Sequence, residues 1–145
     1  MSEIKYRQAT LSDLEHVTVL VTQAYAEDRA NIPDIPDVTQ GLGADIETGT
    51  VFVAVKAAQI AGVVVLAEND DALMIVNVAV SPQAQGLGVG KGLMQQAEDL
   101  AHSRGKRRLS LRTHAGLAKT RAIYRRLGWI ETGQRENVIS MEKTL

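Results

Sequence analysis

A glycine-rich segment, Gln85–Gly92, is the part of this sequence whose residue types and spacing most clearly indicate chemistry. It follows an apolar run, Leu73–Val80, that is typical of a strand, and it opens a run with helical periodicity, Leu93–His102. Backbone N–H groups of a glycine turn at the start of a helix point outward, and the helix dipole adds partial positive charge there. The segment therefore predicts a site for a ligand that bears phosphate.

The spacing of the glycines decides between three kinds of phosphate site. A P-loop requires Gly-x4-Gly-Lys-Ser/Thr, and Gln85 and Gly92 stand where its first glycine and its hydroxyl belong. The dinucleotide fingerprint Gly-x-Gly-x-x-Gly, begun at Gly86 or Gly88, ends on a lysine or a leucine. Both spacings fail. A third spacing, Gln/Arg-x-x-Gly-x-Gly/Ala, is matched in full by residues 85–90.

The segments around the turn have the periodicities of a mixed α/β domain. Alternating and β-branched runs predict strands over Ile4–Ala9, Val51–Lys56, Ile60–Ala67, Leu73–Val80, Leu109–Thr113, Trp129–Thr132 and Val138–Lys143. A first helix of about four turns is expected after a capping box at Ser12 and Glu15. Further helices are expected within Val38–Glu47, Leu93–His102 and Leu117–Leu127. We expect one domain over residues 1–145, with a parallel crossover around the glycine turn.

Composition narrows the function classes. Hydrophobic residues at 45% and charged residues at 23% are globular values, and a net charge of −1 gives no reason to expect nucleic acid or a membrane as partner. The absence of cysteine excludes disulfides, thiolate metal sites and a covalent cysteine intermediate, and no metal site is predicted. The N-terminal residues lack an apolar signal segment, so we expect a cytoplasmic protein.

Four further segments accompany the third glycine spacing in a fixed order. They are Tyr6–Thr10 before Asp13, Val78–Pro82, Ala122–Trp129 and Ser140–Lys143. Together they resemble the GCN5-related N-acetyltransferase (GNAT) superfamily over nearly the whole chain. The resemblance implies a mixed, mostly antiparallel sheet of about six to seven strands with about four helices. It also implies that the sheet parts between the strands Leu73–Val80 and Leu109–Thr113 to seat a thioester.

The resemblance further implies acetyl-CoA as cosubstrate and direct transfer of its acetyl group to a primary amine of a small molecule or peptide. The extended pantetheine arm would pair with the strand backbone at Val78, Ala79 and Val80. Glycines let the backbone of the turn approach the pyrophosphate without a Cβ in the way. The amides that would hold it belong to Gln85, Gly86, Leu87, Gly88, Val89, Gly90 and Lys91.

Two residues are candidates for proton transfer. Tyr124 matches the family's tyrosine that faces the coenzyme sulfur, and is expected to protonate the leaving thiolate. Many family members have a glutamate base on the strand before the turn, but Met74–Val78 contains no carboxylate and Asn77 cannot act as a base. His114 ends the following strand. It is either a base, directly or through water, or a polar loop residue that caps the next helix.

Acceptor recognition is expected from the loop after the first helix and from the strand before the turn. The candidates are Tyr25, Asp28 and Asn77, with Asp34 and Asp37 in the proline loop. The acidic residues favour a cationic amine. The short link Gly133–Asn137 indicates an open acceptor face, closed by the partner of a homodimer or open to an extended peptide-like substrate.

Two other function classes stay open at this point. A non-catalytic module that binds CoA or acetyl-CoA, acting as a sensor or an interaction partner, would keep the glycine turn without turnover on any amine. A nucleotide-binding protein would be stabilised by ATP rather than by acetyl-CoA. The intact glycines and Tyr124 favour the enzyme over the first of these.

Overall fold

A seven-stranded sheet runs through the molecule, in agreement with the predicted fold class. The computed structural model describes residues 3–32 and 39–145, with the backbone alone for 27–29. The strands are β1 (Lys5–Gln8), β2 (Val51–Lys56), β3 (Gln59–Asn69), β4 (Ala72–Val80), β5 (Arg108–His114), β6 (Ile130–Arg135) and β7 (Val138–Thr144). Their order is β1-β2-β3-β4-β5-β7-β6. All neighbours are antiparallel except β4 and β5, which form the predicted parallel pair. Every predicted strand is confirmed, with small differences at the ends.

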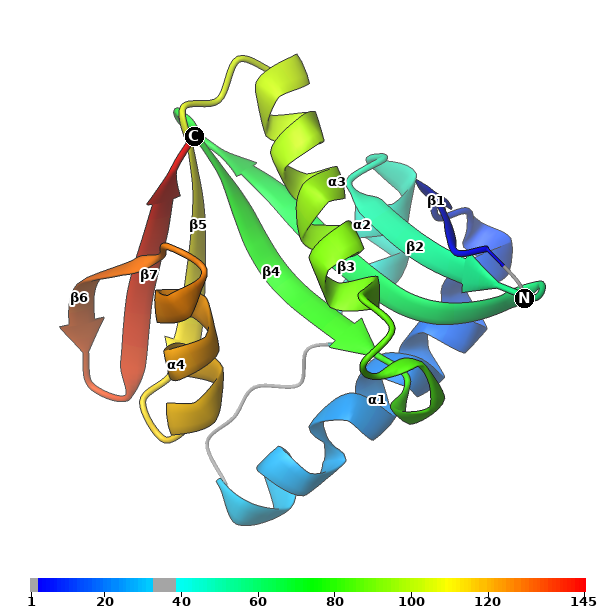
Figure 1. Cartoon of the computed structure of the whole chain (residues 1–145), viewed down its shortest axis with the longest axis horizontal. Helices are drawn as coiled ribbons and strands as arrows, with labels where there is room; N and C mark the ends of the chain where they lie inside the picture. Colours follow the sequence, from blue (N-terminus) through cyan, green and yellow to red (C-terminus); the bar gives the residue numbers. More distant parts are fainter. Residues whose placement is uncertain (1–2, 33–38) are drawn as a thin grey trace.

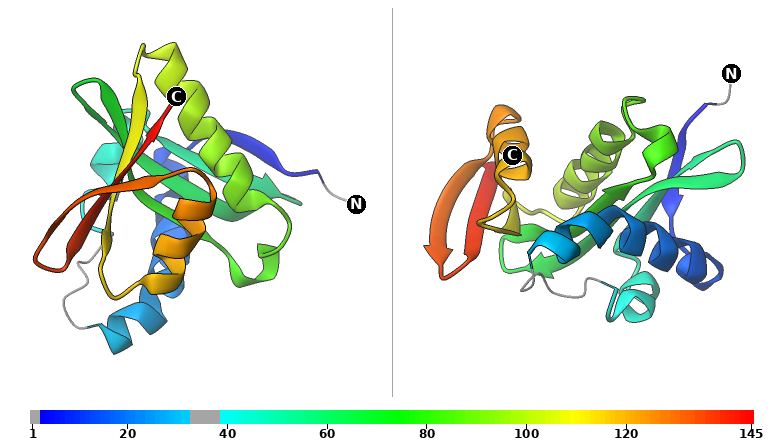
Figure 2. Two further views of the ribbon diagram at one scale, coloured as in Figure 1. Left: turned by 60° about the vertical axis from the view of Figure 1, so that its left-hand side comes forward. Right: turned by 90° about the horizontal axis from the view of Figure 1, so that it is seen from below.

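Helices cover both faces of the sheet. Figures 1 and 2 place α3 (Val89–Ser103) and α4 (Ala118–Arg126) on one face, and α1 (Leu14–Asn31) and α2 (Leu42–Glu47) on the other. The predicted helices are confirmed, although α1 is longer and α2 shorter than the sequence indicated. Within the described ranges, no helix combines the length and apolar character that crossing a membrane requires.

The chain enters α1 through a cap that the sequence analysis placed wrongly. Asp13, not Glu15, closes it: its Oδ2 accepts a hydrogen bond from the Thr10 N–H at 2.8 Å, at the start of a 3-10 turn over residues 11–13. Arg7 donates to both carboxylate oxygens of Asp13, at 2.7 and 3.0 Å. The Arg7 hydrogen bonds lower the pKa of Asp13 to about 2. The inserted 3-10 turn moves the cap two residues toward the N-terminus.

Two apolar clusters lie on opposite faces of the sheet, and together they bury β3 on both sides. Val63 and Val65 pack with α1 and α2, whereas Val64 and Leu66 pack with α3. Successive side chains of a strand point to opposite faces, so a strand covered on both sides is apolar at every position. This explains the continuous apolar run along β3.

The sheet parts between β4 and β5. These strands pair only from Ala72 with Arg108 to Ile75 with Leu111, although both continue beyond that point. A register shift against β3 falls at the same place and leaves Val76 as the extra residue of a β-bulge on β4. Figure 1 shows the two strands diverging from a common end, with α3 over β4 and α4 beside β5. The predicted gap is thus present, and it opens toward the glycine turn.

A prediction of stability follows from the contact between β1 and α3. A Cβ at Gly92 would overlap the ring of Tyr6, whose side chain crosses the helix there. We expect Gly92→Ala to lower the free energy of unfolding by about 1–3 kcal/mol, measured by urea denaturation. Gly90→Ala is the matched control, because its nearest neighbour is Val80 Cγ2 at an ordinary 3.8 Å. Equal effects of the two variants would contradict the prediction, and in a Tyr6→Ala background the Gly92→Ala substitution should cause little further loss.

Candidate functional site

The glycine turn leaves backbone donors unused at the start of α3. Gly86 and Gly88 have φ values of +82° and +81°, and the space where a Cβ of either would lie is open. The helix begins at Val89, and the Gly92 N–H donates to the Gly88 carbonyl at 3.0 Å. Within the described chain the N–H groups of residues 89–91 have no backbone acceptor. The turn therefore presents converging donors to an anion.

Two anchors fix the direction in which these donors point. The side chain of Val89 is buried against the α3-side cluster, while residues 85–88 are exposed. Gly62 on β3 lies directly beneath, where a Cβ would come within 2.7 Å of Val89 Cγ1 and 3.0 Å of Leu93 Cδ1. The lack of a side chain at Gly62 thus lets the first turn of α3 sit close to the sheet.

The free edge of β4 lines the gap with backbone groups. Ser81 donates its N–H to the Ala61 carbonyl at 2.8 Å. Alternate residues of an antiparallel strand turn their amides to the same neighbour, so Val80 and Val78 direct theirs away from β3 and into the gap. The same alternation turns the amide of Ala79 toward β3, and its side chain is buried in the α1-side cluster. Of the three predicted strand residues, the geometry thus favours two as backbone contacts of a ligand.

Tyr124 lies on the α3 side of the sheet, where Val78 and Val80 also pack. Its ring meets that of Trp129 edge to face, with centroids 5.5 Å apart. Burial raises the pKa of the Tyr124 hydroxyl to about 12, so the phenol keeps its proton at neutral pH. No residue in the described part of the chain forms a hydrogen bond with this hydroxyl, which leaves it available to donate.

The helix that carries Tyr124 is tied to the sheet by a contact that the sequence analysis missed. Arg121 binds Glu131 of β6 through Nη2 at 2.6 Å and Nε at 3.2 Å, and its Nη1 donates to the Ala115 carbonyl at 3.0 Å. The Arg121 hydrogen bonds lower the pKa of Glu131. No local pattern could have indicated this pair, because the partners belong to different elements.

His114 ends β5 opposite Val138 and is turned toward its own loop. Its Nδ1 accepts a hydrogen bond from the Gly116 N–H at 2.9 Å. A neutral imidazole that accepts at Nδ1 carries its proton on Nε2. To act as a base it would take the proton on Nδ1 and lose the Gly116 contact. The geometry favours the loop role of the two roles that the sequence left open.

Asn77 lies on the other side of β4 from Tyr124. It alternates with Ala79 and so faces α1, with a side chain that is 3% exposed. Both amide atoms, Nδ2 and Oδ1, lack a hydrogen-bond partner among the described residues. An unpaired buried polar atom costs about 1–3 kcal/mol. A group of this kind beside a gap in a sheet indicates a position that a ligand or water completes.

The other predicted acceptor residues are only partly described. Tyr25 on α1 is half-buried against the α1-side cluster. The side chain of Asp28, and the whole of Asp34 and Asp37, lie outside the described residues. Lys91 is exposed on the first turn of α3.

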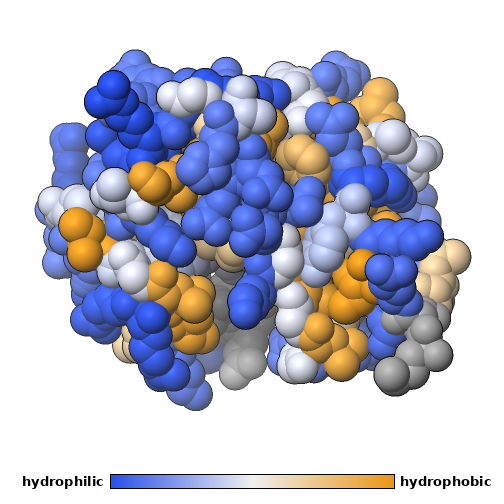
Figure 3. Space-filling view, turned by 45° about the horizontal axis from the view of Figure 1, so that its top comes forward, coloured by the Kyte–Doolittle hydropathy of each residue, from blue (hydrophilic) through white to orange (hydrophobic). Residues whose placement is uncertain are grey.

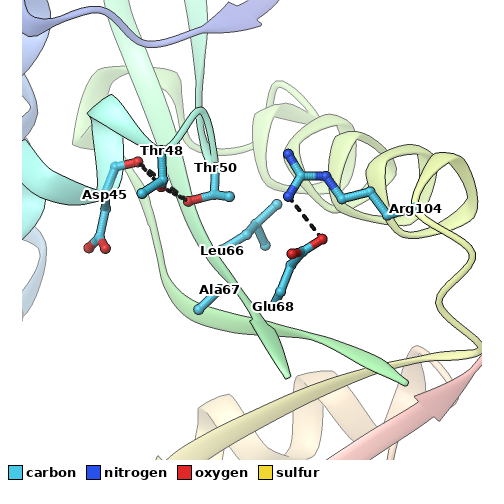
Figure 4. A pocket seen from close by; sticks show the side chains of 7 residues that line it. All are labelled: Asp45, Thr48, Thr50, Leu66, Ala67, Glu68 and Arg104. Carbon is cyan, nitrogen blue, oxygen red and sulfur yellow. Dashed lines mark hydrogen bonds and ion pairs between the residues drawn. The ribbon is translucent and has the colours of Figure 1, made fainter. Parts of the chain in front are cut away.

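A hollow of about 320 Å³, shown in Figure 4, is lined by Arg104 at the C-terminal end of α3, the opposite end of that helix from the glycine turn. Arg104 pairs with Glu68 across it at 3.0 Å, and Thr48 Oγ1 donates to the Asp45 carbonyl at 2.7 Å. Arg104, Glu68, Thr48 and Thr50 thus already have partners, and the hollow is separate from the gap. Figure 3 shows that apolar side chains on the viewed face form separate patches within a mainly hydrophilic surface.

Comparisons with solved structures return acetyltransferases. The PaiA N-acetyltransferase of Thermoplasma acidophilum, in complex with coenzyme A, has a TM-score of 0.85 at 16% identity, with 99% of each chain covered. The ribosomal-protein-S18-alanine N-acetyltransferase of Escherichia coli has a TM-score of 0.79 at 20% identity, covering 98% of this chain and 94% of that one.

A longer protein contains the same fold as one part. N-acetylglutamate synthase of Neisseria gonorrhoeae, complexed with coenzyme A and N-acetyl-glutamate, has a TM-score of 0.79 at 20% identity; all of this chain aligns with 36% of it. No curated protein matches this sequence. The model of the acetyltransferase (GNAT) family matches residues 19–129, most of the chain. The chain belongs to the GNAT acetyltransferase family.

Proposed function

We propose that this protein transfers the acetyl group of acetyl-CoA directly to a primary amine. The observation that carries the proposal is the coincidence of three features at one opening. β4 and β5 separate beyond Ile75 and Leu111, the glycine turn presents unused N–H groups where the gap widens, and the phenol of Tyr124 packs on the same side. A family relative with this fold is known in complex with coenzyme A, which supports the choice of donor.

The residues present fit acetyl-CoA. The amides of the turn, from Gln85 to Lys91, would hold the pyrophosphate, because open space faces Gly86 and Gly88. The free edge of β4 would pair with the pantetheine amides through Val78 and Val80 as an added strand would. The N–H of Val78 would then stabilise the carbonyl oxygen as it becomes negative. Acetyl-CoA supplies the activated acyl carbon in this arrangement.

The amine nitrogen attacks the thioester carbon, the C–N bond forms and the C–S bond breaks. The amine loses one proton to solvent, and the departing sulfur takes one from the Tyr124 hydroxyl, which is reprotonated from solvent. The products are an acetamide and free thiol. Asn77 would orient the amine, because its Oδ1 is buried, unpaired within the described chain and able to accept an amine N–H. Tyr25 would contribute to the acceptor side, and His114 is assigned to its loop.

Ligand binding and thiol release together test this function. Acetyl-CoA and CoA should raise the melting temperature, whereas ATP at the same concentration should not. Release of free thiol should then follow when amino acids, polyamines, aminoglycosides or short peptides are added. The protein has no cysteine, so a thiol reagent reports only the released coenzyme. Binding of CoA without turnover on any amine would overturn the enzyme in favour of a sensor; stabilisation by ATP alone would indicate a nucleotide-binding protein.

A further inference from the structure

A second, smaller hollow of about 120 Å³ lies over the paired part of β4 and β5 and reaches Arg112, just past their last pair. It is lined by side chains and backbone from three neighbouring strands, β5, β7 and β6, and from the end of β3 and the start of β4. The register places Ser110 beside Met74 and Glu142, and Arg112 beside Ser140. On β5, Ser110 and Arg112 alternate with Leu109 and Leu111, which pack toward α3, so Ser110 and Arg112 face the side on which Asn77 lies.

Arg112 is the cation of this hollow. Its guanidinium is exposed and forms no hydrogen bond or ion pair with any residue that the structure describes. Glu142, which also lines the hollow, forms an ion pair with Arg108: the Arg108 Nε lies 3.5 Å from the Glu142 Oε1. Arg108 is further held by Asp71 at 3.0 Å. The charge of Arg112 is therefore the one left without an opposite partner among the described lining residues.

Hydroxyl groups surround this cation. Ser110 Oγ is buried and has no hydrogen-bond partner within the described chain. Ser140 lies directly across from Arg112 on β7. Thr132 of β6 lines the same hollow, but its Oγ1 already donates to the Ser140 carbonyl at 3.4 Å. A guanidinium presents two parallel N–H groups that match the two oxygens of a carboxylate. Hydroxyl groups can donate to the remaining lone pairs of those oxygens. This donor set suits a carboxylate.

The hollow is placed where an acceptor would extend from the gap. Arg112 is the first residue of β5 after the last one paired with β4, Leu111. It thus stands at the point where the strands begin to part, on the same face as the unpaired amide of Asn77. A molecule with its carboxylate on Arg112 would direct the rest of its length toward the gap.

We propose that Arg112, with Ser110 and Ser140, binds a carboxylate of the acceptor, so that the acceptor is an amino acid or a short peptide. The inference rests on the proposed function, because it assigns the hollow to the acceptor of that transfer. It differs from the sequence expectation of a cationic acceptor, which drew on acidic residues outside the described part. A zwitterionic amino acid agrees with both expectations, the cationic amine and the carboxylate, since its amine would enter the gap while its carboxylate stays on Arg112.

Matched pairs of acceptors test the inference through thiol release. L-Amino acids and short peptides are compared with the same molecules as carboxamides. The free carboxylate should be favoured in kcat/KM by about tenfold to a hundredfold, as expected for hydrogen bonds to a charged group. Arg112→Gln should abolish this preference by raising KM for the carboxylate form, with the KM for acetyl-CoA unchanged. Arg107→Gln, an exposed arginine just before β5, is the control.

A binding measurement keeps the test independent of turnover. N-acetyl derivatives of glycine, alanine, leucine, lysine and glutamate, and their carboxamides, are titrated calorimetrically into CoA-saturated protein. Binding of the carboxylates that is lost in Arg112→Gln supports the inference, even if no amine is acetylated and the proposed function fails. Equal affinity for carboxylates and carboxamides, no affinity for either, or a preference that survives Arg112→Gln would overturn it.

Discussion

Replacing Tyr124 with phenylalanine is expected to lower kcat about a hundredfold, in line with the loss of one general acid. The affinity for CoA should change by less than about twofold, because the ring keeps its edge-to-face contact with Trp129 and only the hydroxyl is removed. Steady-state thiol release gives kcat, and calorimetric titration gives the CoA dissociation constant. The effect is limited by the leaving group, since a thiol with a pKa of about 8.5 departs without help more readily than an alcohol.

The pH profile gives a further expectation for Tyr124, and a matched variant separates an acid role from a packing role. The raised pKa of Tyr124, about 12, keeps the phenol protonated throughout the range in which the enzyme can be measured. We therefore expect no loss of kcat up to about pH 10 from its ionisation. Tyr6→Phe is the matched control, because it removes a phenol hydroxyl that contacts α3 at Gly92. Unchanged turnover in Tyr124→Phe, or an equal loss in Tyr6→Phe, would remove the assignment.

The sequence predicts most of the fold because periodicity and turn chemistry are local signals. The buried strands β2 to β4 are rich in β-branched residues, and Gly105 and Gly128 close α3 and α4 with positive φ, as expected of residues that follow a helix. The predicted cap of α1 is wrong because its position is not decided locally. Two overlapping patterns, at Thr10 and Ser12, compete, and the Arg7 contact with Asp13 decides between them through a strand that no local rule includes.

Only the local part of the candidate site can be predicted from the sequence. The glycine turn belongs to this part, because its donors are backbone groups of consecutive residues. The bulge at Val76, the unpaired amide of Asn77 and the cation of Arg112 do not. Each depends on which strands pair and where that pairing stops, and the register of β4 against β3 and β5 is a tertiary property. His114 shows the limit most clearly, since its role turns on the direction of one ring nitrogen.

The largest expected effect on the donor comes from Gly88→Ala. We expect the CoA dissociation constant to rise about a hundredfold, for two reasons. A side chain at φ +81° strains the turn by about 1–2 kcal/mol. Its Cβ would also occupy the open space that the pyrophosphate needs. Gly105→Ala is the matched control: Gly105 has φ +69° and open space around its Cβ, but it ends α3 far along the helix from the turn.

Gly88→Ala and Gly105→Ala should lose comparable stability. A difference between their CoA dissociation constants therefore reports the contact with the ligand. Calorimetric titration with CoA, dephospho-CoA and pantetheine identifies the contact that is lost. CoA and dephospho-CoA both carry the pyrophosphate, and Gly88→Ala should weaken them by the same factor. Pantetheine lacks it and should bind both variants equally. If Gly88→Ala and Gly105→Ala change CoA affinity alike, the turn is only a helix start. The donor site would then have to rest on the edge of β4 alone, where Val78 and Val80 supply the free amides.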